Sequence, residues 1–161
     1  EARKSSRGFK IAMKPPKATP EALEKFSQIV WACGNGKHPK PLKAVFEELA
    51  KMVKTSAKAD GYFGEILTGG RKFAIHAHCC FQRGQEIPKT VFGQAPFKWI
   101  GLQERQKDAK YLSDELDIPV DVIAKLPKPA AIGHIEYVLK DPSHTIGQYT
   151  HSKFSFPKKA A

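Results

Sequence analysis

The sequence predicts an α+β fold, in which helices cover one face of a sheet rich in antiparallel strands. Stretches that alternate apolar and polar residues are interleaved with stretches whose apolar residues recur at helical spacing. The 161 residues are enough for one domain with a substantial core, and 41% of them are hydrophobic. We therefore expect a single domain over 1–161. Because the sequence begins with Glu1 instead of methionine, we expect that domain to be excised from a longer protein.

The first two elements are predicted from alternation and from capping chemistry. GFKIAMK at 8–14 alternates well enough to predict a strand, which the following prolines would end. Thr19 offers a capping hydroxyl and Pro20 suits the first position of a helix. This helix is predicted to end before the Gly-Asn-Gly at 34–36.

A second helix and a β-hairpin are predicted next. The helix would begin near Pro41, because one stripe collects the apolar residues Leu42, Val45, Phe46, Leu49 and Val53. The segments 61–67 and 73–81 both resemble strands and flank Gly69-Gly70, which is typical of a hairpin turn.

The last third of the sequence predicts one further strand, then helices. FKWIGL at 97–102 is predicted to be a strand, and 104–126 is predicted to be helical with an interruption at Pro119. AAIGHIEYVLKD at 130–141 is predicted to be a short helix, and KFSF at 153–156 an edge strand. Strand, helices, hairpin, strand and helices together suggest the antiparallel-rich α+β arrangement.

Charge is the most informative feature of the composition. The formal net charge is +11 and the isoelectric point is near 9.6, which favours a polyanionic partner such as nucleic acid. We expect Lys14, Arg71, Lys72 and Lys98 to contact DNA. The sequence has no run of eighteen apolar residues, so no membrane partner is expected. Three cysteines, an odd number, favour reduced thiols inside a cell over a secreted disulfide framework.

The run FAIHAHCCF at 73–81 predicts a metal site. On a strand, His76 and His78 would share one face, and the predicted hairpin register places Glu65 on the same face. Two imidazoles and a carboxylate suit Mg²⁺, Mn²⁺ or Zn²⁺. A surface histidine pair without metal remains an alternative, as does a structural zinc module that uses the neighbouring cysteines.

One tyrosine stands out as a candidate nucleophile. Tyr137 is the only one of the four tyrosines followed three residues later by a lysine, Lys140. On the predicted helix this spacing would bring the ammonium group to the face that carries the phenol. Tyr111, in DAKYLSDEL, is an alternative nucleophile in an acidic neighbourhood.

The pattern H-hydrophobe-H followed downstream by Y-x-x-K resembles the HUH endonucleases, and most closely the single-tyrosine rolling-circle replication initiators. The resemblance implies a ferredoxin-like or RRM-like antiparallel sheet with the histidine motif on a central strand. It assigns His76, His78 and, less directly, Glu65 to a divalent metal, Mg²⁺ or Mn²⁺. It assigns Tyr137 to strand cleavage and Lys140 to phosphate neutralisation.

The function implied by this resemblance is metal-dependent nicking and joining of single-stranded DNA through a 5′-phosphotyrosine, which would initiate rolling-circle replication. The expected partners are origin DNA, with a helicase domain or a host polymerase, in a bacterial cytoplasm or a eukaryotic nucleus. Two alternatives remain open. One is an HUH transposase or relaxase, and the other is a non-catalytic ferredoxin-like nucleic-acid-binding domain.

Overall fold

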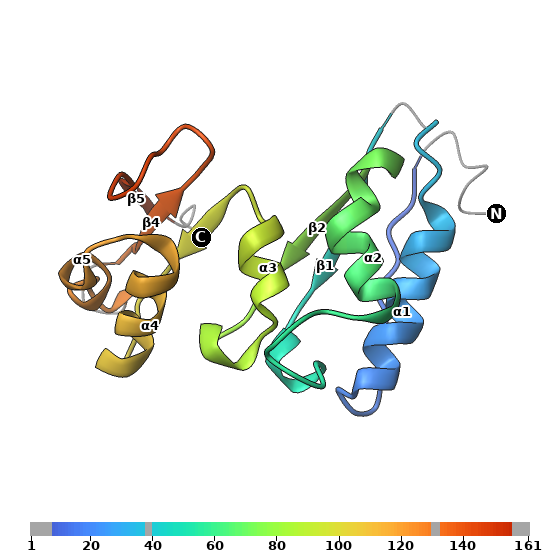
Figure 1. Cartoon of the computed structure of the whole chain (residues 1–161), viewed down its shortest axis with the longest axis horizontal. Coiled ribbons are helices and arrows are strands. Elements are labelled where there is room, and N and C mark those ends of the chain that lie inside the picture. The colour runs from blue at the N-terminus through green and yellow to red at the C-terminus, as the bar shows by residue number, and fades with distance from the viewer. Residues whose placement is uncertain (1–7, 38–39, 130–132, 156–161) are drawn as a thin grey trace, which may run out of the picture. The chain divides into compact units, whose positions relative to one another are not determined.

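The computed structural model describes residues 8–37, 40–129 and 133–155, and these divide between two compact units (Figure 1). The first unit spans Glu1–Gln94 and the second Ala95–Ala161. The first contains a two-stranded parallel sheet and the second a three-stranded antiparallel sheet. The predicted α+β class is therefore confirmed. Among the described residues, no helix is both long and apolar enough to cross a membrane.

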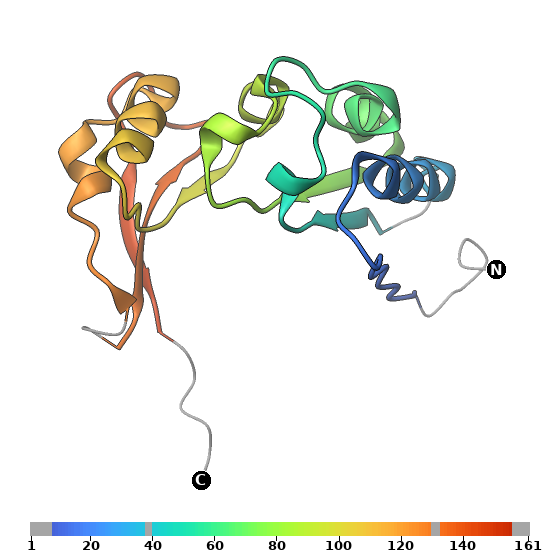
Figure 2. The same cartoon turned by 90° about the horizontal axis from the view of Figure 1, so that it is seen from below.

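Strands β1 (Leu42–Phe46) and β2 (Ile75–Cys79) form the parallel pair of the first unit. Helices α1 (Pro20–Cys33) and α2 (Gly61–Gly69) pack against each other beside these strands (Figure 2). The rings of Phe26 and Phe63 both meet the ring of Phe46 edge to face, with centroids 5.3 and 5.1 Å away. Because Phe46 is only 1% exposed, this aromatic contact is the centre of the first core.

Local chemistry explains why α1 matches its prediction. The Thr19 hydroxyl accepts a 3.3 Å hydrogen bond from the Ala22 backbone N–H, and Pro20 is the first helical residue. At the other end, the Gly34 N–H donates to the Val30 carbonyl at 3.0 Å. The remaining elements of this unit are short: η2 (Leu49–Lys51), η3 (Gly70–Phe73), η4 (Gly84–Glu86) and α3 (Lys89–Gln94).

The second unit contains β3 (Lys98–Ile100), α4 (Gln106–Leu116), α5 (Val120–Ala124), β4 (Ile135–Lys140) and β5 (Thr150–Phe154). The strand order is β3-β4-β5, and every neighbouring pair is antiparallel. The strand predicted at 97–102 and the helices predicted over 104–126 are confirmed. Ile100 and Val138 pair across β3 and β4 and are 5% and 0% exposed, so they lie on the buried face of this sheet.

The helix predicted from Pro41 is wrong, because that segment forms β1 and then η2. The spacing of its apolar residues fits both a helix and a strand. Ala44 and Phe46 alternate inward at 2% and 1% exposure, while Val45 points outward at 50%. What selects the strand is hydrogen bonding to β2, a segment far away in the sequence.

The predicted hairpin is also wrong. Residues 61–67 belong to helix α2, whose buried Phe63 and Ile66 are three residues apart, as on one helix face. Strand β2 pairs in parallel with β1, so it is not the central strand of an antiparallel sheet. The ferredoxin-like arrangement is therefore not confirmed.

Three predictions near the ends of the chain also differ from the structure. Residues 8–14 form no strand. The helix predicted over 130–141 is wrong, because Ile135–Lys140 is strand β4, while residues 130–132 lie outside the described residues. The predicted edge strand at 153–156 overlaps β5, which ends at Phe154, and Phe156 lies outside the described residues.

Candidate active site

Two acidic residues follow the buried strand β1 directly. Glu47 and Glu48 come after Phe46, and both are exposed. The Cys80 N–H donates to the Phe46 carbonyl at 2.9 Å, and the Leu49 N–H donates to the Cys80 carbonyl at 3.2 Å. These two bonds position the turn that carries the acids beside the end of β2. In open α/β folds, ligands bind outside the carboxyl ends of the parallel strands, which is where these carboxylates lie.

The backbone of this acidic turn adopts an unusual conformation. Glu48 has φ 51° and ψ 39°, a left-handed geometry that costs a non-glycine residue about 1 kcal/mol or more. Its Oε2 lies 2.6 Å from the ammonium of Lys51, and Leu49 is fully buried immediately after it. Residues held in such conformations cluster at functional sites, so the geometry marks this turn as a candidate.

The end of β2 adds polar groups next to the acids. The exposed Cys80 thiol has a pKa above its usual value, first because it is partly desolvated and second because the Glu47 carboxylate is nearby. Gln82 is exposed, and the Arg83 guanidinium donates to Glu86 Oε1 at 2.9 Å. The Cys80 thiol therefore lies near the acidic turn, and an amide and a guanidinium follow it along the chain.

The predicted metal site does not form as expected. His76 and His78 lie on β2 with exposed side chains, but Glu65 lies on helix α2, so the hairpin register that grouped the three does not exist. The neighbours across the sheet are Lys43 beside His76 and Val45 beside His78. Within the described ranges, no group of three or more His, Cys, Asp or Glu could hold a metal ion.

The predicted tyrosine and lysine are not brought together by a helix. Tyr137 and Lys140 are half-buried residues of strand β4. Residues three apart on a strand point to opposite faces, so the Y-x-x-K spacing separates the two side chains instead of pairing them. The alternative, Tyr111, is a half-buried residue of α4.

The expected DNA contacts lie in different surroundings. Lys14, Arg71 and Lys72 are exposed in the first unit. Lys98 is half-buried on β3, where its ammonium donates to the Ala95 carbonyl at 2.6 Å. Burial, and then the charge of Lys140 across the strand pair, lower the pKa of Lys98.

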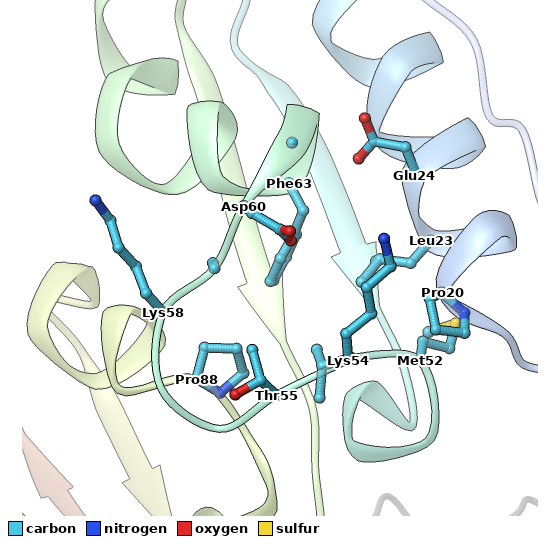
Figure 3. Close-up of a pocket in the computed structure, with 13 residues that line it drawn as sticks. Pro20, Leu23, Glu24, Met52, Lys54, Thr55, Lys58, Asp60, Phe63 and Pro88 are labelled. Carbon is cyan, nitrogen blue, oxygen red and sulfur yellow. The ribbon is translucent and has the colours of Figure 1, made fainter.

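A pocket of about 160 Å³ opens between α1 and the loop that leads into α2 (Figure 3). Both oxygens of the Glu24 carboxylate accept from the Tyr62 N–H at 3.1 Å, at the start of α2. A carboxylate of the protein therefore already occupies the anion-attracting end of this helix. Lys54 and Lys58 line the loop side of the pocket.

Comparison with known proteins finds one similar sequence and several similar structures, all of them viral. No protein-family profile matches it. It is 31% identical over 126 residues to protein P9 of Pseudoalteromonas phage PM2, and the match covers 76% of this chain and 55% of P9. The chain thus spans about half the length of this curated relative.

Solved structures of the genome packaging NTPase B204 from Sulfolobus turreted icosahedral virus 2 are similar to the chain. The complex with AMPPCP has a TM-score of 0.64 at 13% identity, covering 84% of this chain and 63% of B204. The complex with ATP-γ-S has a TM-score of 0.65 at 14% identity, covering 86% and 63%. The chain shares the fold of B204.

These findings contradict the predicted nicking function. The chain resembles a viral genome packaging NTPase in fold and a phage protein P9 in sequence, so the role in strand nicking and rolling-circle replication is wrong. The structure gives the physical reason. The H-x-H and Y-x-x-K patterns are short, and here they lie on strands where neither gathers the partners that the chemistry needs.

Sequence reasoning missed the acidic turn. A signal was present, because the apolar run Ala44-Val45-Phe46 is followed at once by Glu47-Glu48. The helix predicted from Pro41 rests on its apolar residues alone, and the two acids among them were not considered.

Proposed function

We propose that the protein is a nucleoside-triphosphate-hydrolysing enzyme of viral genome packaging, and that Glu47 and Glu48 form part of its nucleotide site. The observation that carries the proposal is the acid pair at the carboxyl end of the parallel strands β1 and β2. The likeness in fold to B204, whose structures include complexes with AMPPCP, ATP-γ-S and AMP, supports it.

The acidic turn fits what phosphoryl transfer needs from a protein. That chemistry depends on positioning and charge stabilisation, and a bound divalent cation would supply much of the charge stabilisation. Mg²⁺ in such sites is held by one or two carboxylates together with the substrate phosphates, so a cage of three protein ligands is not required. One acid would hold the cation and the other would orient the attacking water. Gln82, an exposed residue just after β2, would bind substrate oxygens.

We assign the acidic residues of the nucleotide site to this chain, but not a loop that binds the phosphates. The phosphate-binding motif G-x-x-x-x-G-K-[ST] does not occur in the 161 residues. Tests of hydrolysis use the full-length protein.

Mg²⁺-dependent ATP hydrolysis by the full protein tests the proposal. Glu47→Gln and Glu48→Gln keep the side-chain size and remove the charge, and each is expected to lower kcat on the order of 100-fold. Glu104→Gln is the matched control, because Glu104 is an exposed glutamate of the second unit, and it should leave kcat unchanged. Hydrolysis at the wild-type rate in the Glu47→Gln, Glu48→Gln double variant would remove the acidic turn from the mechanism.

Genome DNA is the proposed macromolecular partner, and Mg²⁺ or Mn²⁺ the proposed metal. The net charge of +11 supports the first, because cations that neutralise phosphates release bound counterions. The acid pair supports the second, since carboxylates are the ligands that these hard cations prefer.

A further inference from the structure

The parallel strands β1 and β2 leave one of their faces open. Ala44, Phe46 and Ile75 are 1–2% exposed on the inner face, whereas Lys43, Val45, His76 and His78 are exposed on the other. The register pairs Lys43 with His76 and Val45 with His78, so the four side chains form one patch. Parallel sheets are normally covered on both faces, so this exposed face is a candidate binding surface.

Basic side chains cluster near the first residues of β1 and β2. The Leu42 N–H donates to the Ala74 carbonyl at 2.9 Å, and the Gly36 N–H donates to the Phe73 carbonyl at 3.1 Å. These bonds hold together the segments 34–37, 40–43 and 71–74, none of which contains an acidic residue. We call the following residues of these segments the basic end: Lys37, Lys43, Arg71 and Lys72.

The charges of the basic end are not neutralised by carboxylates. In the part of the chain that the structure describes, none of its four residues forms an ion pair. Residues 1–94 hold 17 Lys and Arg against 8 Asp and Glu, which is +9 of the net +11. The basic end therefore lies in the unit that carries most of the charge.

We propose that the basic end and the open face beside it bind the phosphate backbone of DNA. Charge complementarity selects this partner, and the proposal rests on the proposed packaging function for the choice of DNA. At roughly 3.3 Å per residue, β1 separates Lys43 from Glu47 by about 13 Å. DNA and nucleotide thus occupy opposite ends of the same strands. The exposed imidazoles of His76 and His78 would lie beside the phosphates on the open face.

Binding of a fluorescent DNA duplex to the full protein, followed by anisotropy over a range of salt concentrations, tests the proposal. The triple variant Lys43→Gln, Arg71→Gln, Lys72→Gln should weaken binding at least tenfold at low salt. It should also reduce the slope of log K against log salt by about 2 to 3, since each lost phosphate contact contributes about 0.9. The matched control removes three exposed lysines of the second unit, Lys107→Gln, Lys110→Gln and Lys128→Gln, and should bind like the wild type.

Equal losses in the two triple variants would overturn the proposal, because binding would then depend on net charge alone. Competition by polyglutamate as strong as by DNA would also overturn it, in favour of an acidic polypeptide partner. The exposed pair Arg71→Gln, Lys72→Gln keeps the test valid if the change at Lys43 impairs folding.

The two proposals fail separately. The basic-end variants should keep their basal ATP hydrolysis, and Glu47→Gln should keep its DNA affinity. Wild-type hydrolysis in the acid variants would therefore show that the nucleotide site was assigned wrongly, and wild-type DNA affinity in the basic-end variants would show the same for the DNA site.

Discussion

Glu136 Oε2 lies 2.9 Å from Nε2 of His151, and this contact joins strands β4 and β5. The other oxygen of Glu136 lies 3.1 Å from Nε2 of His134. One carboxylate therefore bridges two imidazoles on the sheet of the second unit. The hydrogen bond with His134, followed by the charge and hydrogen bond of His151, holds the pKa of Glu136 below its usual value of 4.5.

The bridge predicts how stability depends on pH. A carboxyl group whose pKa is lower in the folded state stabilises the fold when the pH is above its pKa in the unfolded state. This contribution disappears as the pH falls through its pKa in the folded state. Glu136→Gln should therefore be less stable than the wild type at pH 6, and should lose less stability between pH 5 and pH 3. Urea unfolding across this range measures both. Parallel curves for the two proteins, or the same change in Glu104→Gln, would contradict the prediction.

Two adjacent cysteines should react very differently. Burial raises the pKa of the Cys79 thiol to about 12, while the Cys80 side chain is exposed with a smaller increase. At pH 8 almost no Cys79 is thiolate, so in Cys80→Ala this site should resist iodoacetamide until the protein is unfolded. In Cys79→Ala, Cys80 should be alkylated in the folded protein. Intact-mass measurements follow both reactions, with Cys33 changed to alanine in each variant. Similar rates at the two sites would show that the Cys79 thiol is not desolvated.

Neighbouring residues of β3 should contribute unequally to stability. Trp99 is 60% exposed and stacks on Phe97 with ring centroids 5.9 Å apart, whereas Ile100 is 5% exposed against Val138. Ile100→Ala should lower the free energy of unfolding by about 2–5 kcal/mol, because it leaves a cavity in the core. Trp99→Ala should cost less than about 1 kcal/mol, since most of its ring already contacts water. Chemical denaturation measures both, and a larger loss for Trp99→Ala would mean that this aromatic pair is covered in the folded protein.

Predictions that rested on short-range chemistry were confirmed. Thr19 and Pro20 specify the start of α1 through contacts within one turn, and Pro119 separates α4 from α5. The errors fell where one apolar pattern suits both a strand and a helix, as at 42–53 and 135–140. There the prediction chose the helix, and the structure has β1 and β4.

The candidate site could not be predicted from motifs, because its location depends on strand pairing. Glu47 and Glu48 lie at the carboxyl end of a parallel strand pair only because residues 42–46 form a strand and β2 lies parallel to it. The histidines of β2 were recognised, but their neighbour across the sheet is Lys43 and not the expected Glu65.

The sequence by itself determined the α+β class, the excess of positive charge, the helix that begins after Thr19 and the break at Pro119. These properties follow from composition and from contacts between residues a few positions apart. Only the tertiary structure decided that residues 42–46 extend beside residues 75–79, and hence that two carboxylates stand at one end of this pair and the basic end at the other. The physical reason is that β1 is stabilised by hydrogen bonds to β2, which lies more than thirty residues away in the sequence. The residues around β1 do not reveal that partner.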